Sequence, residues 1–222
     1  EVEPTYPDVR EDYAELLFGV GRDDDSLAAA RELVTMEPLV EIFWFRIADL
    51  AATLDRQALL DEAVAHMAEA APDGINTTLA PVSLALYHGR IDEARAGFAA
   101  ARARAPATIA EDWVMFRWSQ ADPVVDDRLA RAAAEANTTF AFYAALRGDA
   151  DLFFTSVAAA GNSHVGYNVY GVMRSPIGQP YLADTRAKQL LRDYGFEAYW
   201  REKGWPALCR PGGTDDLACG AP

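Results

Sequence analysis

Two cysteines, Cys209 and Cys219, are the residues of this chain best placed to form a covalent bond with each other. They lie ten positions apart around Pro211-Gly212-Gly213, and a turn-rich loop of that size can bring two Cα atoms within disulfide range. A disulfide here would indicate an oxidising compartment, either the periplasm or the extracellular space. The alternative is a pair of free thiols in a cytoplasmic protein. A zinc site is disfavoured, because two cysteines would need two further ligands.

The three histidines do not form the pattern of an active site. His66 and His88 fall within or at the end of expected helices, which favours ordinary surface or packing roles. His164 is the better candidate for contact with a small ligand, because Asn162 and Ser163 precede it in an irregular stretch. No serine elbow, phosphate-binding loop or zinc-binding helix motif accompanies any of them. We therefore expect no catalytic residue, cofactor or metal, and a protein that is not an enzyme.

Acidic residues are numerous but scattered, as on solvated helix faces. The densest run is Asp23-Asp24-Asp25, just before an expected helix at Leu27–Glu37. A calcium loop would need a longer oxygen-ligand pattern with a closing glutamate, which is missing here. We therefore expect these aspartates to cap the helix and to complement its dipole.

The elements that carry these residues are predicted to be helices in regular pairs. A helix opening at Gly89 and ending before Pro106 places Ile91, Ala94 and Phe98 on one face. Prolines recur in the same register, at Pro38, Pro72 and Pro106. The glycine recurs at Gly21, whereas the middle copy has Asp55-Arg56 at this point.

This register resembles the tetratricopeptide repeat, a helix–turn–helix unit of about 34 residues. The large aromatic residue expected early in the first helix is Trp44. The resemblance implies three copies, Pro7–Val40, Glu41–Gly74 and Ile75–Thr108. The predicted fold is all-α, a tetratricopeptide-like helical solenoid of about five helix pairs with a C-terminal helical cap.

The rest of the chain is predicted to continue as less regular helices. We expect a linker over 1–7, repeats over 7–161, and cap helices with a disulfide-bonded tail over 162–222. Gly161–Pro180 contains many loop signals, and Asp122-Pro123 is expected to start a helix. The expected helices are Asp112–Gln120, Val124–Glu135, Thr138–Arg147, Asp149–Ala160, Leu182–Tyr194 and Phe196–Lys203.

The C-terminal part carries a second resemblance. Tyr194-Gly195-Phe196, Tyr199-Trp200-Arg201 and Gly204-Trp205-Pro206, followed by Cys209 and Cys219, are similar to the end of repeat domains in CadC-type regulators. Those are bacterial membrane-anchored transcription factors with a periplasmic sensor domain. The same residues also suit a cap over the last repeat of a solenoid, which would otherwise leave an apolar face open.

The repeat resemblance also implies a partner-binding groove lined by the first helix of each repeat. Such a groove suits an extended peptide or a small polar ligand. Leu79 and Trp113 could instead pack between repeats. The residues at the groove positions are Phe45, Asp49, Thr53, Asn76, Leu79, Ser83, Tyr87, Trp113, Arg117 and Gln120.

The charge of the chain limits its partners. The formal net charge of −14 repels phosphate backbones, so we expect no direct nucleic-acid contact by this segment. The acidity either keeps the protein soluble or suits a basic partner. No apolar run is long enough to span a bilayer, and any membrane anchor would lie outside this segment.

These observations favour a protein-interaction or sensory repeat domain, the periplasmic or extracytoplasmic part of a membrane-bound transcriptional regulator or signalling protein. Two alternatives remain. One is a small-ligand sensor, with the ligand in the groove or near His164, and the other is a cytoplasmic scaffold. A closed pocket would favour the sensor and an open groove the protein partner.

Overall fold

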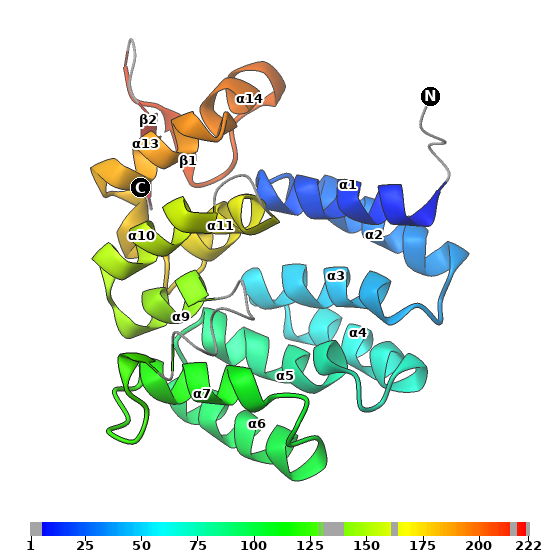
Figure 1. Cartoon of the computed structure of the whole chain (residues 1–222). Coiled ribbons are helices and arrows are strands. Elements are labelled where there is room, and N and C mark those ends of the chain that lie inside the picture. Colours follow the sequence, from blue (N-terminus) through cyan, green and yellow to red (C-terminus); the bar gives the residue numbers. More distant parts are fainter. Residues whose placement is uncertain (1–5, 129, 131–139, 161–163, 214–216, 221–222) are drawn as a thin grey trace. The chain divides into compact units, whose positions relative to one another are not determined.

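The structure is a computed structural model that describes residues 6–128, 130, 140–160, 164–213 and 217–220. Its helices follow one another in consecutive pairs, and these described residues form an all-α fold with one small β-hairpin (Figure 1). It divides into two compact units. Unit 1 comprises Glu1–Phe18 and Arg22–Trp113, and unit 2 comprises Gly19–Gly21 and Val114–Pro222.

Unit 1 contains three helix pairs with the predicted period. The first helices of the pairs begin at Pro7, Glu41 and Ile75, each 34 residues after the previous one. α3 packs against α2, α4 and α5, as expected when helix pairs stack in sequence. The helices are α1 (Pro7–Gly19), α2 (Asp23–Met36), α3 (Glu41–Thr53), α4 (Gln57–Ala70), α5 (Ile75–Tyr87) and α6 (Ile91–Arg104).

The turn inside each pair has the same backbone conformation. Gly21, Asp55 and Gly89 have positive φ angles of 80°, 55° and 64°, and they too are 34 residues apart. Aspartate is one of the few non-glycine residues that tolerate this left-handed conformation. The middle pair therefore makes the same turn without glycine.

The core of unit 1 forms where the pairs meet. Trp44 is buried, and its indole N–H donates to the Pro38 carbonyl at 2.9 Å. Phe98 is fully buried. The side chain of Glu41 accepts hydrogen bonds from both the backbone N–H and the hydroxyl of Thr77, which ties the start of α5 to the start of α3.

One local expectation in unit 1 was wrong. Asp23, Asp24 and Asp25 do not precede the second helix but form its first turn. Arg22 occupies the N-cap position, and among the described residues no side chain caps this helix end. The three carboxylates still lie at the positive end of the helix dipole, which is the favourable end for them.

Unit 2 continues with shorter helices. α7 (Ala110–Ser119) contributes its end to this unit. The helix predicted over Val124–Glu135 does not begin at Val124, because residues 123–126 are not helical and the first helical residue described is Asp127; positions 129 and 131–135 lie outside the described residues. Asp122 accepts a hydrogen bond from the Val124 N–H at 3.0 Å. The remaining elements are α9 (Phe140–Arg147), α10 (Ala150–Ala160), α11 (His164–Arg174), α12 (Gln179–Leu182), α13 (Thr185–Asp193), α14 (Phe196–Lys203), β1 (Cys209–Pro211) and β2 (Leu217–Cys219).

Two helices, α11 and α12, form within the stretch of loop signals at Gly161–Pro180, and the described loop between them is at residues 175–178, where Ser175-Pro176 and Gly178 indicated one. Gly166 and Gly171 weaken the helix signal in the sequence. Tertiary packing outweighs that cost, since Tyr170 and Met173 are buried on the same helix. The next helix, α13, begins three residues later than expected, at Thr185, because Asp184 caps it.

The C-terminal part of unit 2 packs around Trp200. This residue is fully buried, with ring centroids of Tyr170 and Phe196 at 5.0 and 5.6 Å. Its indole N–H donates to the Val20 carbonyl at 2.9 Å. After α14, the chain forms the β1–β2 hairpin, in which Cys209 and Cys219 pair directly and are joined by a disulfide.

Candidate partner-binding surface

The side chains of the first helices in unit 1 contact one another across successive pairs. On α3 and α5, the Tyr87 hydroxyl donates to Asp49 Oδ1 at 3.0 Å. The resemblance to tetratricopeptide repeats placed both residues in a groove, and the structure brings them into direct contact. Both side chains are half-buried, so their outer atoms remain accessible.

A second contact joins α1 to α3 through charge. The guanidinium of Arg46 donates to Glu11 and, at 2.7 Å, to Glu15. The three side chains are largely buried, with exposed fractions of 16%, 13% and 9%. Charge-assisted bonds of this kind hold both helices in one register.

The sequence analysis missed Glu11 and Glu15, although the repeat period pointed to them. They lie 34 residues before Phe45 and Asp49, so they occupy the equivalent positions in the first pair. Extending the register one copy towards the N-terminus would have included them. Arg46 gave no such signal, because its role depends on the neighbouring helix.

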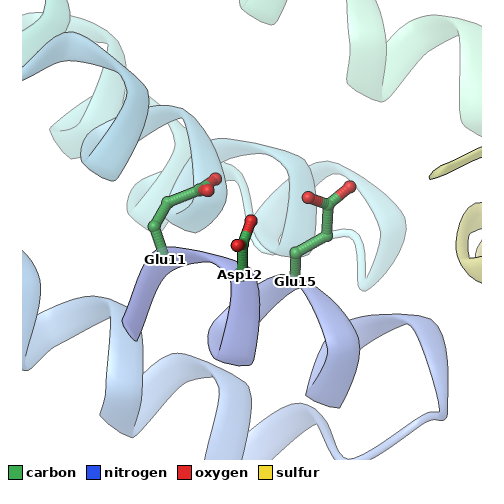
Figure 2. A group of neighbouring side chains, drawn as sticks. All are labelled: Glu11, Asp12 and Glu15. Atoms are coloured by element: carbon green, nitrogen blue, oxygen red, sulfur yellow. The ribbon is translucent and has the colours of Figure 1, made fainter. Parts of the chain in front are cut away.

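Glu11 and Glu15 also lie beside a third carboxylate, Asp12. Figure 2 shows the three side chains along α1, and their oxygens lie within 4.8 Å of one another. Such spacing could suit a cation, but Arg46 already supplies positive charge to two of the three. We interpret the cluster as an ion-pair network between helices, with a surplus of negative charge at the surface.

The other groove candidates of unit 1 lie around these contacts. Phe45 is half-buried, with the Arg46 guanidinium 5.9 Å from its ring centroid.

On α5, three candidates are half-buried: Asn76, Leu79 and Ser83. The Ser83 hydroxyl donates to the Leu79 carbonyl at 3.2 Å. Thr53 is buried, and its hydroxyl has no hydrogen-bond partner among the described residues. We call the half-buried residues Phe45, Asp49, Asn76, Leu79, Ser83 and Tyr87, together with Glu11, Glu15 and Arg46, the first-helix surface.

The last three groove candidates make local contacts. Trp113 belongs to unit 1 and packs on α6, with Phe98 at 5.7 Å and the Arg102 guanidinium at 4.9 Å from its ring. Arg117 and Gln120 belong to unit 2. Arg117 pairs with Asp122 at 2.7 Å, and this hydrogen bond raises the pKa of the guanidinium. Gln120 donates to the Ser119 hydroxyl at 3.1 Å.

Two histidines have packing contacts. His66 stacks on Trp44 with ring centroids 3.9 Å apart, and a ring nitrogen of His88 lies 3.0 Å from the Ala52 carbonyl oxygen. His164 starts α11, but its side chain lies outside the described part of the chain.

Unit 2 contains an open hollow of about 620 Å³ between α10 and α13. Phe154 and Leu190 contribute apolar surface to it, and the Arg186 guanidinium lies 4.5 Å from the Phe154 ring centroid. Arg186 pairs with Asp151 and Asp184 at 2.6 and 2.8 Å, so its charge is already balanced. These pairs hold the rim of the hollow in place.

Comparisons with models of protein families, with curated proteins and with solved structures give no match for this chain. The tetratricopeptide and CadC-type relationships therefore rest on the sequence patterns alone. In the part of the chain that the structure describes, no helix is both long and apolar enough to cross a bilayer.

Proposed function

We propose that this chain is a protein-interaction domain that holds an extended, basic peptide on the first-helix surface. The observation that carries the proposal is the alignment of Glu11, Phe45 and Leu79, and of Glu15, Asp49 and Ser83, at equivalent positions of three successive helices. Such alignment gives a repeating series of apolar and polar contacts, which suits an extended chain. With Asp12, this region contains four carboxylates and a single guanidinium, that of Arg46. The excess of negative charge favours a peptide rich in lysine and arginine.

An added positive charge tests this proposal. Ser83→Arg places a cation in the middle of the first-helix surface, and the Ser83 hydroxyl bonds only within its own helix turn in the contacts described. Thr35→Arg is the matched control, because Thr35 is exposed on α2 and its hydroxyl likewise donates to a carbonyl four residues earlier. The probe is a lysine- and leucine-rich peptide selected from a displayed library against the wild-type chain.

We expect Ser83→Arg to weaken peptide binding about tenfold or more, and Thr35→Arg to leave it unchanged. Fluorescence anisotropy gives the two dissociation constants, and circular dichroism confirms that both variants fold. Equal loss in both variants, or failure of the library to yield a saturable binder, would contradict the proposal.

The Cys209–Cys219 disulfide supports an extracytoplasmic location, as part of the same proposal. With the C-terminal resemblance, it favours the sensory part of a membrane-bound regulator over a cytoplasmic scaffold. A small-ligand sensor is the second candidate, because the hollow between α10 and α13 has the volume of a ligand site. Thermal-shift screening with Phe154→Ala as the variant would distinguish it, since peptide binding to unit 1 should not respond to that change.

A further inference from the structure

An apolar stripe runs along the outer side of α1, away from the residues that pack inside unit 1. Tyr6, Val9, Tyr13 and Leu16 have exposed fractions of 56%, 37%, 56% and 39%. Their spacing alternates between three and four residues, which is the a/d pattern of a coiled-coil seam. An adjacent side of the helix is buried through Ala14, Leu17 and Phe18.

The stripe consists of four apolar side chains in one register rather than single exposed residues. α1 packs one apolar face against the core and carries a second apolar face in solvent. Single exposed apolar residues are common on protein surfaces, but a second apolar face is not. Contiguous exposed apolar surface on a folded domain marks an interaction site. Two a/d repeats on a helix of 13 residues are what a partner helix would pack against.

Charge beside the stripe indicates what kind of helix fits. Asp8 and Asp12 are exposed along one edge. Arg10 lies towards the other edge, and it pairs with Glu32 of α2 at 2.7 Å. The edges therefore present net negative charge, which selects a partner with lysine or arginine beside its own apolar seam.

The same charges disfavour two other occupants. In an antiparallel pairing of two copies of α1, Asp12 would face Asp12 of the second copy across the seam, and like charges there are destabilising. An anionic lipid surface attracts helices with basic rather than acidic edges.

We propose that the outer face of α1 is a docking surface for a basic amphipathic helix of another protein. The apolar residues of this surface, Tyr6, Val9, Tyr13 and Leu16, are not part of the first-helix surface, and Asp12 borders both surfaces. The partner helix places apolar residues at a and d positions against Tyr6, Val9, Tyr13 and Leu16. Its lysine or arginine residues lie beside Asp8 and Asp12.

The test uses a designed 21-residue helix with leucine at a and d positions and lysine at the flanking positions, titrated into the whole chain. A scrambled peptide of the same composition and a peptide with glutamate in place of lysine are the reference probes. Tyr13→Asp is the principal variant. Leu39→Asp is its control, because Leu39 is 73% exposed between α2 and α3, outside the stripe.

We expect saturable binding of the lysine helix, weakened about tenfold or more by Tyr13→Asp and unaffected by Leu39→Asp. Asp8→Lys should weaken binding of the lysine helix and strengthen binding of the glutamate helix, because Asp8 is exposed and lies outside the first-helix surface. Three results would overturn the proposal: no binding up to about 1 mM peptide, equal binding of the scrambled peptide, or loss of binding in Leu39→Asp as well. It would also be overturned if sedimentation showed a dimer of this chain that Tyr13→Asp dissociates, or if vesicles of anionic lipid bound in a Tyr13-dependent way.

Discussion

The hydroxyl of Tyr87 donates a 3.0 Å hydrogen bond to Oδ1 of Asp49, and this bond joins the first helices of two successive helix pairs. The acceptor is a carboxylate and both side chains are half-buried. The bond should therefore contribute to stability as well as position two residues of the first-helix surface.

Tyr87→Phe should lower the free energy of unfolding by about 1 kcal/mol, because it removes the hydrogen bond but keeps the ring. Urea denaturation measures the change. Asp49→Ala in the Tyr87→Phe background should cost less than in the wild type, because the two residues share one bond. Additive losses in the double variant would show that the bond does not form. Ser83→Ala should change stability little, since its hydroxyl bonds within its own helix.

Arg46→Gln should destabilise the chain by about 3 kcal/mol, because it leaves Glu11 and Glu15 largely buried without their cation. The triple variant Glu11→Gln, Glu15→Gln, Arg46→Met removes all the charges together. It should recover most of the loss, since a buried ion pair is replaceable by neutral groups. Thermal unfolding measures the stability of both variants. A triple variant as unstable as Arg46→Gln would contradict the prediction that unpaired buried charge causes the loss.

Gly21→Ala should cost more than Gly148→Ala, although both glycines have nearly the same φ angle, 80° and 79°. A Cβ at Gly21 would lie 2.8 Å from Tyr170 Cε1 and 2.9 Å from Pro206 Cβ, whereas at Gly148 it would meet nothing within 4 Å. We expect about 1 kcal/mol from backbone strain at Gly148, and a further 1–3 kcal/mol, roughly, from overpacking at Gly21. Equal melting temperatures for the two variants would refute this close packing.

Asp184 should make stability depend on pH in the acid range. Its side chain caps α13 by accepting the Arg186 N–H at 2.8 Å, and hydrogen bonds from the Arg186 side chain and backbone hold its pKa below the ordinary value of 3.8. Because the folded-state pKa is lowered, the stabilisation is present above the ordinary value and is lost as pH falls through the folded-state value.

Asp184→Asn keeps a capping group but removes the charge. It should therefore be less stable than the wild type near pH 6, and the difference should shrink as the pH falls below 3.8. Urea unfolding along a pH series measures this. A difference that stays constant over the series would show that the charge of Asp184 is not what stabilises the helix end.

Cys209→Ser should lower stability by about 2–3 kcal/mol under oxidising conditions, because the disulfide closes a short loop in the unfolded chain. Under reducing conditions the variant and the wild type should unfold alike. Intact mass after alkylation, with and without prior reduction, provides the direct check. Alkylation of the unreduced protein, made in an oxidising compartment, would show free thiols and remove the argument for an extracytoplasmic location.

The helix pairs of unit 1 could be predicted from the sequence, because their signals are local. Pro38, Pro72 and Pro106 each lie two residues after the end of a second helix, where a proline disfavours its continuation. Gly21 and Gly89 make left-handed turns that few other residues adopt. The bounds of α1, α3 and α5 follow from the 34-residue register. The Cys209–Cys219 bridge is also local, since the nine residues between the cysteines contain the turn-forming sequence Pro211-Gly212-Gly213.

Only the tertiary structure decided which side chains meet. Arg46 contacts Glu11 and Glu15 because α1 packs beside α3, and nothing in the sequence around Arg46 indicates that neighbour. Helix α11 forms in spite of two glycines, because burial of Tyr170 and Met173 outweighs their low helix propensity. The sequence of α1 does not indicate which of its apolar residues are exposed, because this depends on which side of the helix packs in unit 1. A sequence pattern tells which residues share a face, whereas packing determines which face remains in solvent.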